Sequence, residues 1–250
     1  MKHKLAVVTG GASGIGLGVA RALLEQETPV VIGDVGREQL DEVGAIPGVT
    51  AVPCDVTSED GVAALAKSAE AIGHVDFVMA NAGVAAGGRF ESIPQTEWHR
   101  LFEVNVHGVV RTINAFLPGM LERGQGTIVI TGSSAGLFNS DGFNAPYTAS
   151  KHAVLGVAKA LSAYTADKGL SVHYLAPRLT DTAFPRSAVA WGRRGRSVMT
   201  DRDIGTDFDT VDDVVAALLA GIEEDRFVIS LTPGTEERLT RFAQTLASDF

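Results

Sequence analysis

The stretch Leu5-Ala-Val-Val-Thr-Gly-Gly-Ala-Ser-Gly-Ile-Gly16 decides the fold of this chain. Its first five residues form an apolar run typical of a strand, and glycines follow at positions 10, 14 and 16. Beyond them, apolar residues recur with helical spacing up to Leu24. A strand, a glycine turn and a helix together direct backbone N–H groups towards a phosphate. The stretch therefore predicts a dinucleotide-binding loop, although a tight turn that binds nothing has the same local pattern.

Strand-like runs recur along the chain, and a helical pattern follows each of them. The runs cover residues 5–9, 30–33, 50–53, 77–80, 127–131, 171–175 and 227–231. Several are apolar throughout, as expected of strands buried on both faces of a parallel sheet. No repeat, linker or low-complexity tract divides the chain. We therefore expect an α/β fold in which a single domain, residues 1–250, holds a doubly wound parallel sheet of about seven strands flanked by helices.

The composition narrows the classes of protein to which the chain can belong. Its net charge of −9 argues against a general nucleic-acid binder. It has no run of eighteen apolar residues, so no membrane span is expected, and the apolar run near Met1 is too short for a secretory signal. The single cysteine, Cys54, cannot form an internal disulfide, and the six histidines lack metal-ligand spacing. We expect a cytoplasmic protein with no metal site.

A tyrosine and a lysine stand four residues apart in the stretch Tyr147-Thr-Ala-Ser-Lys151. On a helix, residues at this spacing share a face. The ammonium of Lys151 would then lower the pKa of the Tyr147 phenol, which could exchange a proton with a substrate oxygen near neutral pH. Taken alone, the pattern also fits an ordinary pair on a helix surface.

Six short motifs, taken together, resemble the short-chain dehydrogenase/reductase family. They are Thr9-Gly-Gly-Ala-Ser-Gly-Ile-Gly16, Cys54-Asp55-Val56, Asn81-Ala82-Gly83, Asn105-Val-His-Gly108, Gly132-Ser-Ser-Ala-Gly136 and Tyr147-Thr-Ala-Ser-Lys151. Each motif is weak alone, but all six occur in the family's order, and the resemblance ends near Thr182. It implies a Rossmann-like fold, a nicotinamide cofactor and hydride transfer between a secondary alcohol and a ketone.

The resemblance also implies a catalytic group. Tyr147 would be the general acid/base, Lys151 would lower its pKa and bind the nicotinamide ribose, and Asn105 would help to hold a proton-relay water. A serine would stabilise charge on the substrate oxygen. The strand alignment points to Ser133 for this role, whereas the usual spacing to Tyr147 points to Ser134. We prefer Ser133, because strand register fixes the direction of a side chain.

The expected cofactor is NAD. Asp34 ends an apolar strand about twenty residues beyond the glycine loop, where a carboxylate can bind the adenosine ribose and repel the extra phosphate of NADP. Asp34 could instead be a helix-capping acid, and Arg37 is the local argument for NADP. By resemblance, the other cofactor-binding residues are Gly10, Ser13, Gly14, Ile15, Gly16, Asp55 and Val56 (adenine), Asn81 (adenosine ribose), Ala82, Gly83, Tyr147, Lys151, Pro177 and Thr182 (nicotinamide).

The segment 178–210 departs most from the family pattern. Arg178 stands where relatives have glycine, and could turn outward, contact a cofactor phosphate or bind an anionic substrate. The segment is long for a connection, as expected of a substrate lid, and it is rich in arginine. These arginines, which either attract an acidic substrate or face solvent, are Arg178, Arg186, Arg193, Arg194, Arg196 and Arg202.

The sequence thus predicts an NAD-dependent short-chain alcohol dehydrogenase or ketoreductase that acts on a small-molecule alcohol or ketone. The alternatives are an NADPH-dependent carbonyl reductase of the same fold and a non-catalytic dinucleotide-binding regulator. Relatives assemble partly through the helix that bears Tyr147, and this chain ends in an amphipathic stretch over residues 236–246. We therefore expect a homodimer or a homotetramer.

Overall fold

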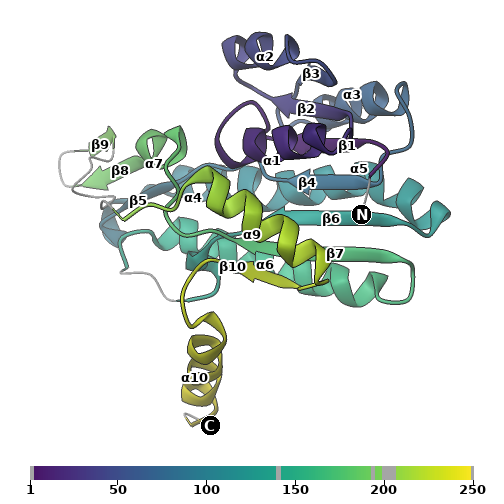
Figure 1. Cartoon of the computed structure of the whole chain (residues 1–250). Helices are drawn as coiled ribbons and strands as arrows, with labels where there is room; N and C mark the ends of the chain where they lie inside the picture. Colours follow the sequence, from purple (N-terminus) through teal and green to yellow (C-terminus); the bar gives the residue numbers. More distant parts are fainter. Residues whose placement is uncertain (1–2, 139–141, 193–194, 199–206, 249–250) are drawn as a thin grey trace.

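The computed structural model describes residues 3–138, 142–192, 195–198 and 207–248, and a seven-stranded sheet forms its centre (Figure 1). All neighbouring strands in this sheet are parallel. Their order is β10 (Val228–Ser230), β7 (Leu170–Ala176), β6 (Gly126–Thr131), β4 (Phe77–Ala80), β1 (Ala6–Thr9), β2 (Val30–Asp34) and β3 (Val49–Pro53). The expected doubly wound parallel sheet is confirmed, and each strand overlaps one of the apolar runs.

Helices cover both faces of this sheet. One apolar cluster lies between the sheet and the helices α1 (Gly14–Glu25), α2 (Arg37–Gly44) and α9 (Val211–Glu223). A second lies on the opposite face, under α3 (Glu59–Glu70), α5 (Gly108–Arg123) and α6 (Ala145–Thr165). Because both faces are buried, the central strands are apolar at nearly every position, which explains why the sequence pattern identified them.

A second, small sheet was not predicted. It consists of β5 (Ala86–Gly88), β8 (Val189–Gly192) and β9 (Gly195–Val198), and it stands at the edge of the molecule (Figure 1). Its strands are short and rich in glycine, and every residue of β9 is exposed. Such strands carry no apolar alternation, so the sequence pattern did not reveal them. Strands β8 and β9 lie in the segment 178–210, which the sequence predicted to be irregular.

The remaining α-helices of the described residues are shorter or peripheral. They are α4 (Gln95–Phe102), α7 (Ala183–Ser187) and α10 (Thr235–Ser248). Helix α10 extends away from the body of the molecule (Figure 1). At its base, the guanidinium of Arg238 stacks 4.0 Å above the ring centroid of Phe138, and Leu239 packs against the cluster under α6.

The motifs found in the sequence lie where the strands end. The glycine loop follows β1, Asn81 follows β4, Ser133 follows β6 and Pro177 follows β7. The chain reverses its direction of winding between β1 and β4, which are neighbours in the sheet. In open parallel sheets, ligands bind at the carboxyl ends of the strands beside such a switch point.

Candidate functional site

A cavity of about 1080 Å³ opens at the carboxyl ends of the strands. Its walls come from the loops after β1, β2, β3, β4, β6 and β7, together with α6 and α7. Of the predicted site residues, those that line the cavity are Gly10, Ser13, Gly14, Ile15, Asp34, Asp55, Val56, Asn81, Ala82, Gly83, Ser133, Tyr147, Lys151, Pro177 and Thr182. Gly16 and Asn105 lie behind this wall. The space exceeds that of a typical pocket for one small ligand.

The glycine loop is closely packed. Gly10 and Gly14 have φ values of +61° and +53°, which favour glycine. A Cβ on Gly16 would lie 2.4 Å from the carbonyl oxygen of Gly10 and 2.7 Å from the amide nitrogen of Asn81. Ser13 stands at the N-terminus of α1, where its side chain accepts no cap hydrogen bond within the described structure, and no acid lies in the first turn. The loop thus presents free N–H groups to the cavity, which suits a pyrophosphate.

Replacing Gly16 by alanine is expected to weaken nucleotide binding by about tenfold or more, because overpacking of this kind costs about 1–3 kcal/mol. The added methyl group would press the loop away from Asn81. Isothermal titration with NAD measures the change. Gly73→Ala is the matched control, since a Cβ at Gly73 would meet no atom within 4 Å. Equal affinity in both variants would mean that the loop does not hold the nucleotide.

Asp34 accepts backbone hydrogen bonds at the end of β2. One carboxylate oxygen takes the N–H groups of Val35 (2.7 Å) and Gly36 (3.1 Å), and the other takes that of Ala12 (3.1 Å). The carboxylate therefore ties β2 to the glycine loop, and it also borders the cavity. This position is compatible with binding of ribose hydroxyls. Nearby, burial and the charges of Asp55 and Asp34 raise the pKa of the Cys54 thiol to about 11.

The side chain of Asn81 is engaged within the protein. Its amide nitrogen donates to the carbonyl oxygens of Thr9 (3.1 Å) and Gly10 (2.9 Å), and its oxygen accepts the hydroxyl of Thr131 (3.0 Å). Asn81 thus joins the ends of β1, β4 and β6. The sequence assigned it to the adenosine ribose; in the structure it borders the cavity, and its side chain also shapes the loop around that space.

Tyr147, Ser133 and Lys151 meet at the base of the cavity. The hydroxyl of Ser133 is hydrogen-bonded to Tyr147, and the Lys151 nitrogen lies 5.8 Å from the centroid of the tyrosine ring. Ser134 also borders the cavity, but its hydroxyl makes no such contact within the described part of the chain. This geometry favours Ser133 over Ser134 as the serine beside Tyr147, in agreement with the argument from strand register.

Lys151 and Asn105 are held from behind. The ammonium of Lys151 donates to the carbonyl oxygen of Thr131 (2.8 Å). Asn105 is fully buried in a single π-helical turn (Glu103–His107), a distortion that frequently occurs at functional sites. Its side-chain amide nitrogen donates to the carbonyl oxygen of Val84 and to the hydroxyl of Ser150 (3.0 Å). Its side-chain oxygen accepts the backbone N–H of Val84. Asn105 therefore couples α6 to the loop after β4.

The sequence predicted a lowered pKa for Tyr147, but in the structure its pKa is raised. Burial raises it to about 12, and the hydrogen bond from Ser133 lowers it only in part. Burial also lowers the pKa of Lys151 to about 8. The prediction that the lysine brings the phenol towards neutrality is thus wrong for the chain alone, because desolvation by burial is the largest effect on the pKa of the phenol. Near pH 7 the phenol carries its proton and the lysine is mostly charged.

Tyr174 supports the site, and sequence reasoning missed it. It is fully buried on β7, where its hydroxyl accepts the N–H of Ser133 (3.3 Å) and donates to the carbonyl oxygen of Lys151 (3.2 Å). A Cβ on Gly132 would lie 1.9 Å from its ring, so only glycine fits there. In the sequence, a tyrosine within a largely apolar strand resembles an ordinary core residue, so nothing marked Tyr174 as part of the site.

The segment after β7 forms the outer wall. Thr182 packs against the glycine loop, and Phe184 lies with its ring centroid 6.2 Å from that of Tyr147. The guanidinium of Arg178 pairs with Asp207 and Asp209, and that of Arg186 pairs with Asp181. Arg193, Arg194 and Arg202 lie outside the described residues, and Arg196 is exposed on β9.

Two features are absent from the described residues. None of their helices is both long and apolar enough to span a membrane. No cluster of three or more histidine, cysteine, aspartate or glutamate side chains in this part of the chain could hold a metal ion.

Comparison with known proteins gives a consistent result. The sequence model of the short chain dehydrogenases matches residues 4–192. D-beta-hydroxybutyrate dehydrogenase of Rhizobium meliloti is 31% identical over 209 residues, which cover 80% of this chain and 81% of that protein. Dehydrogenase/reductase SDR family member 4 of Rattus norvegicus is 35% identical over 208 residues, with coverage of 80% and 73%.

A solved structure has the same fold. It is a short chain dehydrogenase/reductase from Burkholderia phymatum, crystallised in complex with NAD. The two chains superpose with a TM-score of 0.86 at 28% sequence identity, over 98% of this chain and 95% of the other.

Proposed function

Because the chain belongs to the short-chain dehydrogenase/reductase family, and is therefore an oxidoreductase acting on small molecules, we propose that it interconverts a secondary alcohol and a ketone with NAD. The observation that carries this proposal is the meeting of Tyr147, Ser133 and Lys151 at the base of a cavity whose other end is the glycine loop. Substrate and nucleotide have room to lie side by side there.

The residues present fit a nicotinamide nucleotide. The glycine loop borders the cavity at the first turn of α1, where Ser13 makes no side-chain cap hydrogen bond among the described residues, and Thr182 packs against Gly14 beside it. Gly10, Ser13, Gly14 and Ile15 would hold the pyrophosphate, with Gly16 packed behind them. Asp34, Asp55, Val56 and Asn81 would hold the adenosine part, and Ala82, Gly83, Pro177 and Thr182 would enclose the nicotinamide half. When bound, the nicotinamide supplies the hydride chemistry.

The chain's own residues supply the proton chemistry. In the reduction direction, Tyr147 donates its proton to the carbonyl oxygen, and the Ser133 hydroxyl donates a hydrogen bond to the same oxygen as negative charge develops. The charged Lys151 then stabilises the phenolate left behind. Asn105 joins α6 to the loop that follows β4, and this keeps Lys151 on α6 in place.

Two features support NAD over NADP. The carboxylate of Asp34 borders the cavity at the end of β2, where it would repel the extra phosphate. The relative from Burkholderia phymatum was crystallised with NAD. The test is nicotinamide reduction by the purified protein, followed by absorbance, across aliphatic, aromatic and carboxylated secondary alcohols. Turnover with NADP alone would refute the choice of cofactor, and nucleotide binding without turnover would favour a non-catalytic regulator.

Asp34→Asn is expected to reduce the preference for NAD over NADP by about tenfold, equivalent to about 1.4 kcal/mol, because it removes the repelling charge. The amide keeps an oxygen for the N–H groups of Val35 and Gly36. The measurement is the ratio of kcat/KM for the two nucleotides. Asp41→Asn, an exposed acid on α2, is the control. A ratio that changes equally in both variants would remove Asp34 from the specificity argument.

We also propose how the rest of the chain serves this function. Residues 1–250 form one domain, and the segment 178–210 serves as the wall and lid of the substrate space, since Phe184, Pro185 and Ala188 line the cavity. The protein assembles in the cytoplasm as a homodimer or homotetramer, with α6 and α10 as the contact surfaces. Light scattering measures the mass of the assembly and so tests its oligomeric state.

A further inference from the structure

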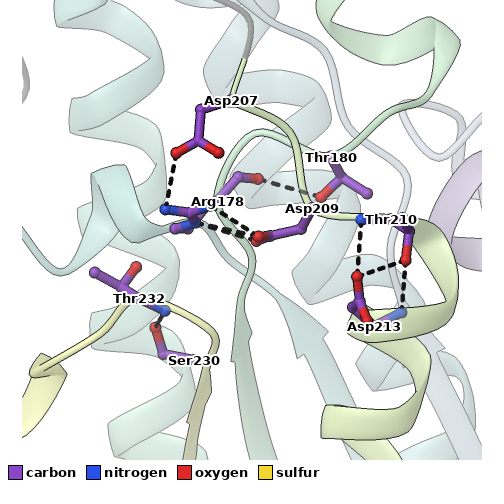
Figure 2. Close-up of polar contacts among 8 residues, drawn as sticks. All are labelled: Arg178, Thr180, Asp207, Asp209, Thr210, Asp213, Ser230 and Thr232. Carbon is purple, nitrogen blue, oxygen red and sulfur yellow. Dashed lines mark hydrogen bonds and ion pairs between the residues drawn. The ribbon is translucent and has the colours of Figure 1, made fainter.

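Arg178 lies between two carboxylates at the mouth of the cavity, directly after β7 (Figure 2). Its Nε is 3.3 Å from both carboxylate oxygens of Asp209, and its Nη2 is 2.9 Å from one of them. Its Nη1 is 3.3 Å from Asp207. The side chain of Asp209 is 14% exposed and that of Asp207 is 87% exposed. Asp209 is therefore the partner that solvent screens least.

The backbone joins the same two segments. Thr180 and Asp209 form a parallel bridge, in which the N–H of Asp181 donates to Asp209 (2.9 Å) and the N–H of Asp209 donates to Leu179 (2.8 Å). The next residue, Thr210, caps α9 in a reciprocal pair of hydrogen bonds with Asp213 (Figure 2). The strand before the segment and the helix after it are thus tied together at one point.

Residues that follow this tie reach both halves of the cavity. A Cβ on Gly14 would lie 3.0 Å from the methyl group of Thr182, so this threonine touches the glycine loop. The hydroxyl of Thr182 accepts the N–H of Phe184 (3.2 Å), and the Phe184 ring faces Tyr147. Thr182 is only four residues from Arg178, so a shift at the tie moves the nucleotide wall and the substrate wall together.

The charge balance argues against two other roles for Arg178. One guanidinium faces two carboxylates, so the local charge is negative and repels a phosphate or carboxylate ligand. Its Nε, Nη1 and Nη2 atoms are all directed at these aspartates. Neither a cofactor phosphate nor an anionic substrate is therefore its natural partner in this arrangement.

We propose that Arg178 and Asp209 form a latch that ties the residues after β7 to those before α9 and so positions Thr182 and Phe184 against nucleotide and substrate. Arg178 is a positioning residue in this role and takes no part in the chemistry. The inference rests on the proposed function for its effect on turnover, but the latch itself is a property of the fold. The latch differs from an ordinary surface ion pair in two respects. The Asp209 carboxylate is mostly buried and accepts hydrogen bonds from two guanidinium nitrogens, and the backbone of Asp209 forms the bridge to Thr180.

The test compares Arg178→Ala and the isosteric Asp209→Asn with Arg226→Ala. Arg226 also pairs with a carboxylate, Glu224, but it lies outside the segment and is 62% exposed. Thermolysin is added under native conditions, and cleavage within residues 179–192 is followed by mass spectrometry. Opening the latch is expected to raise this cleavage rate by about tenfold, a change of about 1.4 kcal/mol in local opening. The KM for NAD should rise by a similar factor, with a smaller change in kcat.

A charge swap, Arg178→Asp with Asp209→Arg, keeps the test decisive if one single variant fails to fold. Partial return of the swapped protein to the wild-type cleavage rate supports the latch. Cleavage as slow in Arg178→Ala and Asp209→Asn as in Arg226→Ala overturns it. Proteolysis needs no turnover, so a protein inactive on every substrate would defeat the proposed function while the cleavage rates still decide the latch.

Discussion

Replacing Tyr147 by phenylalanine is expected to lower kcat for ketone reduction by about a thousandfold, within the range for loss of a general acid. The ring remains to pack against Phe184, so the walls of the cavity are preserved. Only the hydroxyl that meets Ser133 is lost. Nucleotide affinity should therefore stay within about twofold, which is less than 0.5 kcal/mol. Steady-state kinetics and NAD titration on the same preparation measure both quantities.

The matched control is Tyr164→Phe on the same helix, because Tyr164 is 55% exposed and does not line the cavity. It should turn over like the wild type. If Tyr147→Phe keeps its kcat while its nucleotide affinity is normal, another group donates the proton, and the assignment of Tyr147 is wrong. If affinity and kcat fall together, the hydroxyl serves structure rather than chemistry.

The sheet could be predicted because strands buried on both faces need a recognisable run of apolar residues. Runs such as 127–131 and 77–80 are buried at every position and mostly apolar, because helices cover both faces of the sheet. A glycine loop between a strand and a helix then locates the phosphate end of the cavity. These features are local in sequence, so they can be read without knowledge of the packing.

The parts that could not be predicted depend on contacts between distant residues. The small sheet joins Ala86–Gly88 to Val189–Gly192, about a hundred residues apart, through glycine-rich strands without an apolar pattern. Arg178 could be noticed, but its partner Asp209 is separated from it by a long segment. The support that Tyr174 gives to Ser133 depends likewise on the register of β6 and β7.

The pKa of Tyr147 illustrates a different limit. Spacing on a helix predicted that Lys151 lies beside the phenol, and the two are indeed close. Spacing does not measure desolvation, which acts on both groups and moves their pKa values in the directions that favour the uncharged forms. In the reduction direction this is favourable, because a protonated phenol is the form that donates.

Replacing Lys151 by methionine is the second large effect that we expect, with kcat for reduction lowered by about a hundredfold or more. The variant keeps the unbranched stem but loses the charge that stabilises the Tyr147 phenolate, and a close charge of this kind is worth about 3 kcal/mol or more in a buried site. The measurement is kcat at pH 7 under saturating nucleotide. Lys159→Met, an exposed residue on the same helix, is the control and should behave like the wild type.

The pH profile separates this role from a structural one. Burial lowers the pKa of Lys151 to about 8, so the wild-type rate of reduction should fall as pH rises through about 8, when the ammonium loses its proton. The unfolded chain binds more protons than the folded chain between this value and the ordinary pKa of lysine, so the contribution of Lys151 to stability rises over the same window. Loss of rate there would therefore not reflect unfolding caused by this residue. Lys151→Met should show a low rate without this step; a profile unchanged from the wild type would assign the step to another group.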